Sequence, residues 1–139
     1  MGKKTDAQLK ALSAKGDACA KTANSLLNVL KAWPAVDKEW DKWEPEFAKL
    51  SNWEDHPYAK KRIAVWQMGK DLSAKLKNEI HALNMDLATF KGYVTKKEKS
   101  KNPFKSKNSL PSSKETIKMY DKALQNLTEL AQNGSHAFH

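Results

Sequence analysis

The stretch from Tyr58 to Val94, YAKKRIAVWQMGKDLSAKLKNEIHALNMDLATFKGYV, decides the fold, because its apolar and small residues recur at alternating spacings of three and four. This spacing places them along one side of a helix, as in a seam that lies against other helices. The seam consists of Trp66, Gly69, Ser73, Leu76, Ile80, Leu83, Leu87, Phe90 and Val94. At about 1.5 Å per residue the helix is roughly 55 Å long, which predicts the central helix of an elongated bundle.

A second long helix is predicted before this stretch. It begins near Thr5 or Asp6, either of which can cap free backbone N–H groups, and it ends at Trp33 because Pro34 follows. Its seam is bulky at both ends and small in the middle, and it consists of Leu9, Leu12, Gly16, Cys19, Ala23, Leu26, Leu30 and Trp33.

The small middle of that seam has two interpretations. One is a pocket or a groove for a partner helix around Gly16, Cys19 and Ala23. The favoured one is a layer where a neighbouring helix or a large side chain, such as Trp66 or Phe90, packs close. A kink or break at Gly16, followed by a new segment, is also compatible with the cost of glycine inside a helix.

The connector over residues 34–57 combines aromatic and acidic residues. Seven acids stand against three lysines, and four of the five tryptophans lie at its start or within it. Pro34 and Pro45 each suit the first turn of a short helix, which predicts helical turns over residues 35–43 and 45–51. One buried face is predicted for Trp40, Trp43, Phe47 and Leu50.

Residues 95–113 are predicted to form a loop, because Pro103 and Pro111 interrupt a lysine-rich, Ser- and Asn-containing stretch. A final helix is predicted from Ser112, which forms a capping box with Glu115. It ends at Asn133-Gly134, and residues 135–139 are expected to be a flexible tail. Its apolar face carries Ile117, Tyr120, Leu124, Leu127 and Ala131.

These elements predict an all-α fold, an elongated antiparallel bundle of three long helices with one or two short helices in a Trp-rich connector. Residues 1–134 are expected to form a single domain. The last helix is too short to reach the near end of the central helix, so we expect the tryptophan-rich connector to cover the apolar surface there. The acidic connector would then lie at one end of the bundle and the lysine-rich loop at the other.

Composition and charge limit the functions that the sequence allows. The chain of 139 residues has a net charge of +9 and a pI near 9.6. Arg62 is the only arginine, which disfavours sequence-specific nucleic-acid recognition, because bidentate contacts to phosphate or guanine use arginine. The N-terminus is polar and no run of about 18 apolar residues occurs. We therefore expect a cytoplasmic protein, with signal-less secretion or a truncated sequence as alternatives.

No catalytic or metal-binding constellation is readable. The four histidines, His56, His81, His136 and His139, form no Glu-x-x-His pair, and a lone Cys19 does not complete a zinc site. His81 as a general base is disfavoured against a surface or partly buried histidine, and Cys19 is expected to be an inert core thiol. We expect neither an enzyme nor a cofactor.

The sequence favours binding of another macromolecule. The main hypothesis is a protein partner with an acidic surface, bound by an adaptor, effector-type or immunity-type module. The alternatives are non-specific nucleic-acid binding, peripheral contact with an anionic membrane and a small toxin-like nuclease. Oligomeric state is not predicted. The basic binding residues would be Lys96, Lys97, Lys99, Lys101, Phe104, Lys105 and Lys107, and a second partner surface would be Trp40, Trp43 and Trp53.

Overall fold

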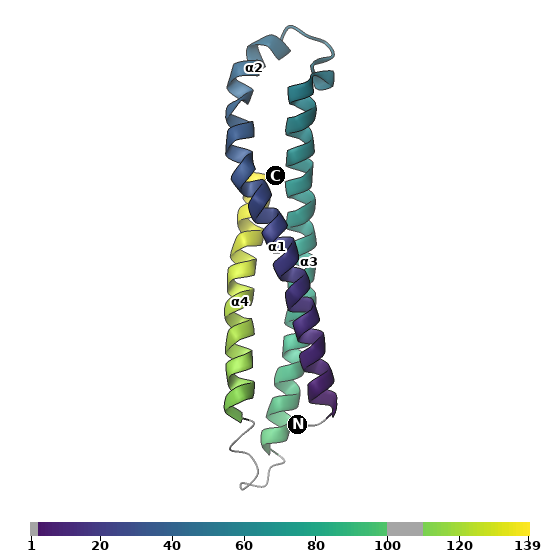
Figure 1. The fold of residues 1–139 in the computed structure, drawn as a ribbon, viewed down its shortest axis with the longest axis vertical. Helices are drawn as coiled ribbons and strands as arrows, with labels where there is room; N and C mark the ends of the chain where they lie inside the picture. The colour runs from purple at the N-terminus through teal and green to yellow at the C-terminus, as the bar shows by residue number, and fades with distance from the viewer. Residues whose placement is uncertain (1–2, 100–109) are drawn as a thin grey trace.

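The computed structural model describes residues 3–99 and 110–139. Its elements are α1 (Lys3–Lys38), α2 (Trp40–Phe47), the 3-10 helix η1 (Trp53–Asp55), α3 (Pro57–Lys99) and α4 (Leu110–Ala137). Three long helices lie side by side in an elongated bundle, with α2 and η1 at one end (Figure 1). The described residues contain no strand. The predicted all-α bundle with short helices in a Trp-rich connector is confirmed.

Helices α1 and α3 run antiparallel over their whole length. Near one end the Gln8 side-chain amide donates a hydrogen bond to the carbonyl oxygen of Asp86. Near the other end the Tyr58 hydroxyl donates to the carbonyl oxygen of Val36. Helix α3 has 43 residues, so it is about 65 Å long. The predicted seam of α3 is buried from Gly69 to Val94, and Trp66 is half-buried.

Helix α1 differs from its prediction at two positions. It neither breaks at Gly16 nor ends at Trp33, and it continues through Pro34 to Lys38. The proline ring removes one backbone hydrogen bond, but the turn that follows buries Val36 against an aromatic cluster. That burial outweighs the lost bond, so the chain stays helical.

The connector also differs from its prediction. Pro45 lies inside α2 rather than at the start of a helix, and η1 follows where no element was predicted. Phe47 is buried as predicted, whereas Leu50 is 45% exposed. The reason is that α2 ends at Phe47, so the helical spacing that would carry Leu50 to the buried face is lost.

Helix α3 continues past Val94 to Lys99, so the predicted loop begins too early. Lysine and glutamate favour helix there, and the Thr95 hydroxyl bonds the carbonyl of Lys91 at 2.9 Å. Helix α4 begins at Leu110, which places Ser112 inside the helix and not at its cap. Pro111 is tolerated because the first turn of a helix does not use its N–H groups.

The end of α4 corrects the predicted tail. Gly134 does not end the helix, which continues to Ala137, and Phe138 is 1% exposed. A Cβ atom on Gly134 would lie 2.2 Å from the Ser73 hydroxyl, and one on Gly69 would lie 2.4 Å from the Phe138 ring. Both glycines therefore permit close packing of α4 on α3, which the short sequence pattern Asn-Gly did not reveal.

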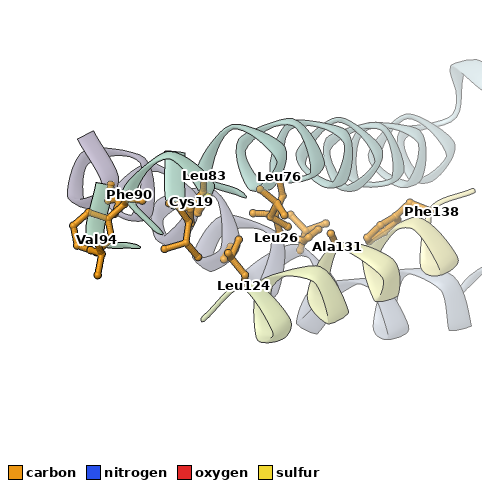
Figure 2. Close-up of a cluster of buried hydrophobic side chains, with 14 residues drawn as sticks. Cys19, Leu26, Leu76, Leu83, Phe90, Val94, Leu124, Ala131 and Phe138 are labelled. Carbon is orange, nitrogen blue, oxygen red and sulfur yellow. The ribbon is translucent and has the colours of Figure 1, made fainter. Parts of the chain in front are cut away.

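The core divides into two clusters. We call the larger cluster, with the parts of α1, α3 and α4 that surround it, the body. Figure 2 shows its side chains along the bundle axis, from Val94 and Phe90 near one end to Phe138 at the other. We call residues 33–62, which contain the second cluster, the tryptophan tip. Its buried members are Val36, Phe47, Tyr58 and Ala59, surrounded by Trp33, Trp40, Trp43 and Trp53.

Phe138, directly after α4, packs against Trp33 at the start of the tryptophan tip, so α4 ends short of α2 and η1 (Figure 1). Beyond its end, α1 and α3 continue as a pair that α2 and η1 close. The other end of the bundle holds the start of α1 and the end of α3. The acidic connector and the lysines at the end of α3 therefore lie at opposite ends of the molecule.

Candidate functional site

Phe47 is the centre of the tryptophan tip. It is 4% exposed, and rings from α2, η1 and the start of α3 surround it. The centroid distances to its neighbours are 5.6 Å for Trp40, 5.6 Å for Trp53, 5.1 Å for His56 and 6.3 Å for Tyr58. Such ring pairs bury a large apolar area. The rings of α2, η1 and the first turn of α3 therefore close this end of the α1/α3 pair without α4.

Tyr58 joins the two long helices of the tip. Its hydroxyl donates to the carbonyl oxygen of Val36, in the last turn of α1, where carbonyl groups lack partners within the helix. Burial raises the pKa of Tyr58 above its ordinary value; Arg62 opposes that shift, and Glu39 and Asp37 add to it. The hydroxyl therefore stays protonated and acts as a structural donor.

His56 belongs to the same cluster. Its Nδ1 accepts a hydrogen bond from the backbone N–H of Tyr58 at 3.1 Å, which requires that nitrogen to be unprotonated. The imidazole ring lies 4.6 Å from the Trp43 ring centroid. His56 thus orders the turn into α3 and packs as an aromatic ring.

Arg62 stands between two tryptophans. Its guanidinium lies 5.2 Å from the Trp33 ring centroid and 4.8 Å from the Trp40 ring centroid, within cation–π distance of both. One terminal nitrogen pairs with Asp37 at 2.9 Å. Trp33 in turn makes an edge contact with Phe138 at 5.3 Å. Arg62 and Trp33 therefore connect the tryptophan tip with the core of the body.

Sequence reasoning missed the roles of Arg62 and His56. The available signal was that the only arginine of the chain follows Tyr58 by one helical turn, beside a tryptophan-rich connector. Such a position favours a stacked guanidinium over a solvated cation. The pairing with Trp33 and Trp40 was not readable, because it depends on α1 continuing through Pro34.

Comparison of the chain with protein-family models, with curated proteins and with solved structures finds no match.

The rim of the tryptophan tip is acidic and solvent-exposed. The predicted partner residues Trp40, Trp43 and Trp53 lie together there and are each partly exposed. Seven exposed acids accompany three lysines over residues 37–55, a local net charge of −4. The acids are Asp37, Glu39, Asp41, Glu44, Glu46, Glu54 and Asp55.

The structure describes the backbone of three of the predicted basic residues. Lys96, Lys97 and Lys99 lie in the last turn of α3, at the end of the bundle that also holds the start of α1. The predictions for Lys101, Phe104, Lys105 and Lys107 concern positions outside the described residues.

Groups that could take part in catalysis are dispersed. His81 is exposed, and Asp86, five residues later in α3, pairs with Lys15 at 2.8 Å. Cys19 is fully buried; burial, and secondarily the carboxylate of Glu79, raise the pKa of its thiol. Over residues 3–99 and 110–139, no three His, Cys, Asp or Glu side chains are grouped to hold a metal ion. No helix in the same ranges combines the length and apolarity needed to cross a membrane.

The small seam of α1 packs in two ways. Cys19 and Ala23 lie in the core of the body, as the favoured interpretation predicted. A Cβ atom on Gly16 would lie 3.3 Å from the Tyr120 ring, so the large side chain that packs there comes from α4 and is neither Trp66 nor Phe90. Beside it a shallow groove of about 510 Å³ lies between α1 and α4, with Met119 59% exposed at its edge.

Proposed function

We propose that the chain is a non-enzymatic binding module for a partner protein, of the adaptor type. The observation that carries this proposal is the tryptophan tip, which extends past α4 with three tryptophans partly exposed. Tryptophan is enriched in the energetically dominant contacts of protein interfaces. Clustered exposed aromatic surface favours a binding role, whereas single exposed apolar residues are ordinary.

The two ends of the bundle suit different contacts. The net charge of +9 and the lysines at the end of α3 would steer that end toward an acidic protein surface. The tryptophan tip is weakly negative, because the −4 charge of residues 37–55 is reduced to −1 over residues 33–62 by Lys60, Lys61 and Arg62. A rod with ends of opposite charge is suited to hold two partners, or two parts of one partner, about 65 Å apart.

The second candidate function is non-specific binding of nucleic acid through the basic end. The observation in its favour is that Lys96, Lys97 and Lys99 share one helical turn at the end of the bundle where α1 begins. Lysine neutralises phosphate without needing bidentate geometry. A membrane with anionic lipids would be attracted by the same charges.

Photo-crosslinking in the cells that make the protein tests the proposal. A photoreactive residue is placed singly at Leu50 on the tryptophan tip, at Met119 beside the α1/α4 groove, and at Met85 on the open face of α3. All three side chains are at least 45% exposed. We expect discrete, protease-sensitive adducts from position 50 above the background from position 85. Adducts no stronger at positions 50 and 119 than at position 85 would contradict a protein-binding function.

Fluorescence anisotropy with labelled DNA and RNA separates the second candidate from the first. If the protein makes six to ten phosphate contacts, its affinity should fall by a factor of about 10³ to 10⁵ as the salt concentration rises from 50 to 200 mM. A steep loss of this kind, abolished when Lys96, Lys97 and Lys99 are replaced by glutamine, would move nucleic-acid binding to first place. No binding at the lowest salt would remove it.

A further inference from the structure

We propose that the tryptophan tip binds a lysine- and arginine-rich segment of a partner protein. This inference rests on the proposed protein-binding function and adds the chemistry of the bound segment. The proposed site is the end of the α1/α3 pair beyond α4. Three observations favour a basic segment there: the tryptophan rings are partly exposed, several of them already stack with a lysine or arginine of the chain, and the acids around them are mostly without an ion-pair partner.

The accessible surface of the tip is its outside. Phe47 fills the centre at 4% exposure, so no cage remains between the rings for a ligand to enter. Trp40, Trp43 and Trp53 are each partly exposed, and Leu50 beside them is 45% exposed. A partner must therefore lie across the outer ring faces, as an extended segment or a helix side would.

Three tryptophans of the tip already carry a cation from the chain itself, one of them Trp33, which lies 5.2 Å from the Arg62 guanidinium. Arg62 lies over Trp40 at 4.8 Å, and Lys42 lies over Trp43 at 5.5 Å. In the described part of the chain, the ring contacts of Trp53 are with Trp40 and Phe47, and no lysine or arginine lies over its ring. Its remaining face is thus the position where a lysine or arginine of a partner can stack.

The charges next to Trp53 favour the same occupant. Glu54 and Asp55 follow it directly and are exposed. Of the seven acids in residues 37–55, Asp37 alone forms an ion pair among the described residues. The other six are available to a basic partner, and they would repel nucleic acid or an anionic membrane from this end.

The positive charge of the whole chain does not cancel this local attraction. Charges are screened over about 8 Å at physiological ionic strength, whereas the basic end lies at the far end of a helix about 65 Å long. A segment that approaches Trp53 therefore experiences the −4 charge of residues 37–55, partly offset by Lys60, Lys61 and Arg62 at the start of α3, and little of the distant lysines.

Anisotropy of a labelled peptide rich in lysine, arginine and leucine, titrated with the full chain, tests the inference. A peptide with glutamate in place of its basic residues is the matched probe. We expect the basic peptide to bind at low salt, more weakly as salt rises, and the acidic peptide not to bind. Failure of the basic peptide to bind at low salt, or equal binding of both peptides, would overturn the inference.

Paired variants locate the contact. Glu54→Gln with Asp55→Asn removes two exposed charges beside Trp53 without changing any ring, and should weaken peptide binding roughly fivefold. The control, Glu115→Gln with Glu129→Gln, makes the same charge change on exposed residues of α4 and should leave affinity unchanged. Equal weakening by both pairs would show that only net charge matters and would overturn the site.

The outcomes separate this inference from the function on which it rests. If crosslinks to a partner form at position 50 or 119 but the basic peptide does not bind, the chemistry assigned to the tip is wrong and protein binding stands. If no position forms a protein adduct, protein binding itself fails. Self-association that depends on Glu54 and Asp55 would mean that a second copy of the chain occupies the tip, and would also overturn the inference.

Discussion

The body and the tryptophan tip of one antiparallel pair, α1 and α3, are held together by different chemistry. In the body, aliphatic side chains and glycines bring three helices close, and Leu12, Leu26, Leu76 and Leu83 have no exposed surface. In the tip, flat rings, an arginine and short helices replace the third helix. The body therefore gains stability through full burial, whereas the tip leaves aromatic surface open to solvent, which a binding surface requires.

The largest expected effect is in the body, at the ring that α4 inserts. Phe138→Ala should lower the free energy of unfolding by about 3 kcal/mol or more, because it removes a buried ring and leaves a cavity between Trp33 and Gly69. Urea unfolding followed by circular dichroism measures this. His139→Ala, at an exposed neighbour, should change stability little. A loss below about 1 kcal/mol for Phe138→Ala would mean that the body core ends before Phe138.

A glycine pair tests whether the body depends on close helix contact. Gly134→Ala should destabilise by about 1–3 kcal/mol, because the new methyl group would meet the Ser73 hydroxyl and the Leu26 side chain. Gly92→Ala on α3 meets nothing within 4 Å and should stabilise by up to about 1 kcal/mol through helix propensity. Equal effects of the two substitutions in urea unfolding would contradict the close contact of α4 with α3.

In the tip, the expected effects are smaller and concern ring stacking. Arg62→Gln should cost about 1–2 kcal/mol and change the tryptophan emission spectrum, because Trp33 and Trp40 lose the cation between them. Asp37→Asn removes only the ion pair, whose carboxylate is 53% exposed, and should cost less than about 1 kcal/mol. If both variants behave alike, the ion pair and not the stack holds Arg62.

Near neutral pH, Tyr58→Phe should cost about 1 kcal/mol for the lost hydrogen bond to Val36, less than Arg62→Gln. At high pH the same residue has a larger role. Burial raises the pKa of Tyr58 in the folded state, and also that of Tyr120 in the body. The folded chain thus holds these protons more tightly than the unfolded chain, so the stability that these two tyrosines contribute is constant below about pH 10 and is lost as the pH rises through the raised values.

Unfolding at a series of alkaline pH values distinguishes the two tyrosines. Tyr58→Phe should flatten the alkaline loss of stability that comes from the tip, and Tyr120→Phe the loss that comes from the body. Unchanged alkaline profiles in both variants would show that neither hydroxyl is linked to folding.

Sequence periodicity predicted the body well because each of its helices buries residues spaced three and four apart. A seam with spacings of three and four identified the buried side of α3 and most of the buried side of α1. Periodicity failed where a tertiary contact overrode a local signal: Pro34 and Gly134 are usual helix stops, yet burial of Val36 and of Phe138 keeps both segments helical. The position of Arg62 was unreadable for the same reason, since it depends on where α1 ends.

The antiparallel pairing of α1 and α3 also has a consequence for the order of folding. The contact between Tyr58 and Val36 closes a loop of 22 residues, whereas the contact between Gln8 and Asp86 closes one of 78. Closing the longer loop first costs about 1 kcal/mol more chain entropy. The two helices should therefore pair first at the tryptophan tip and then toward the opposite end of the bundle. The aromatic cluster that leaves rings exposed in the native state is then also where we expect folding to begin.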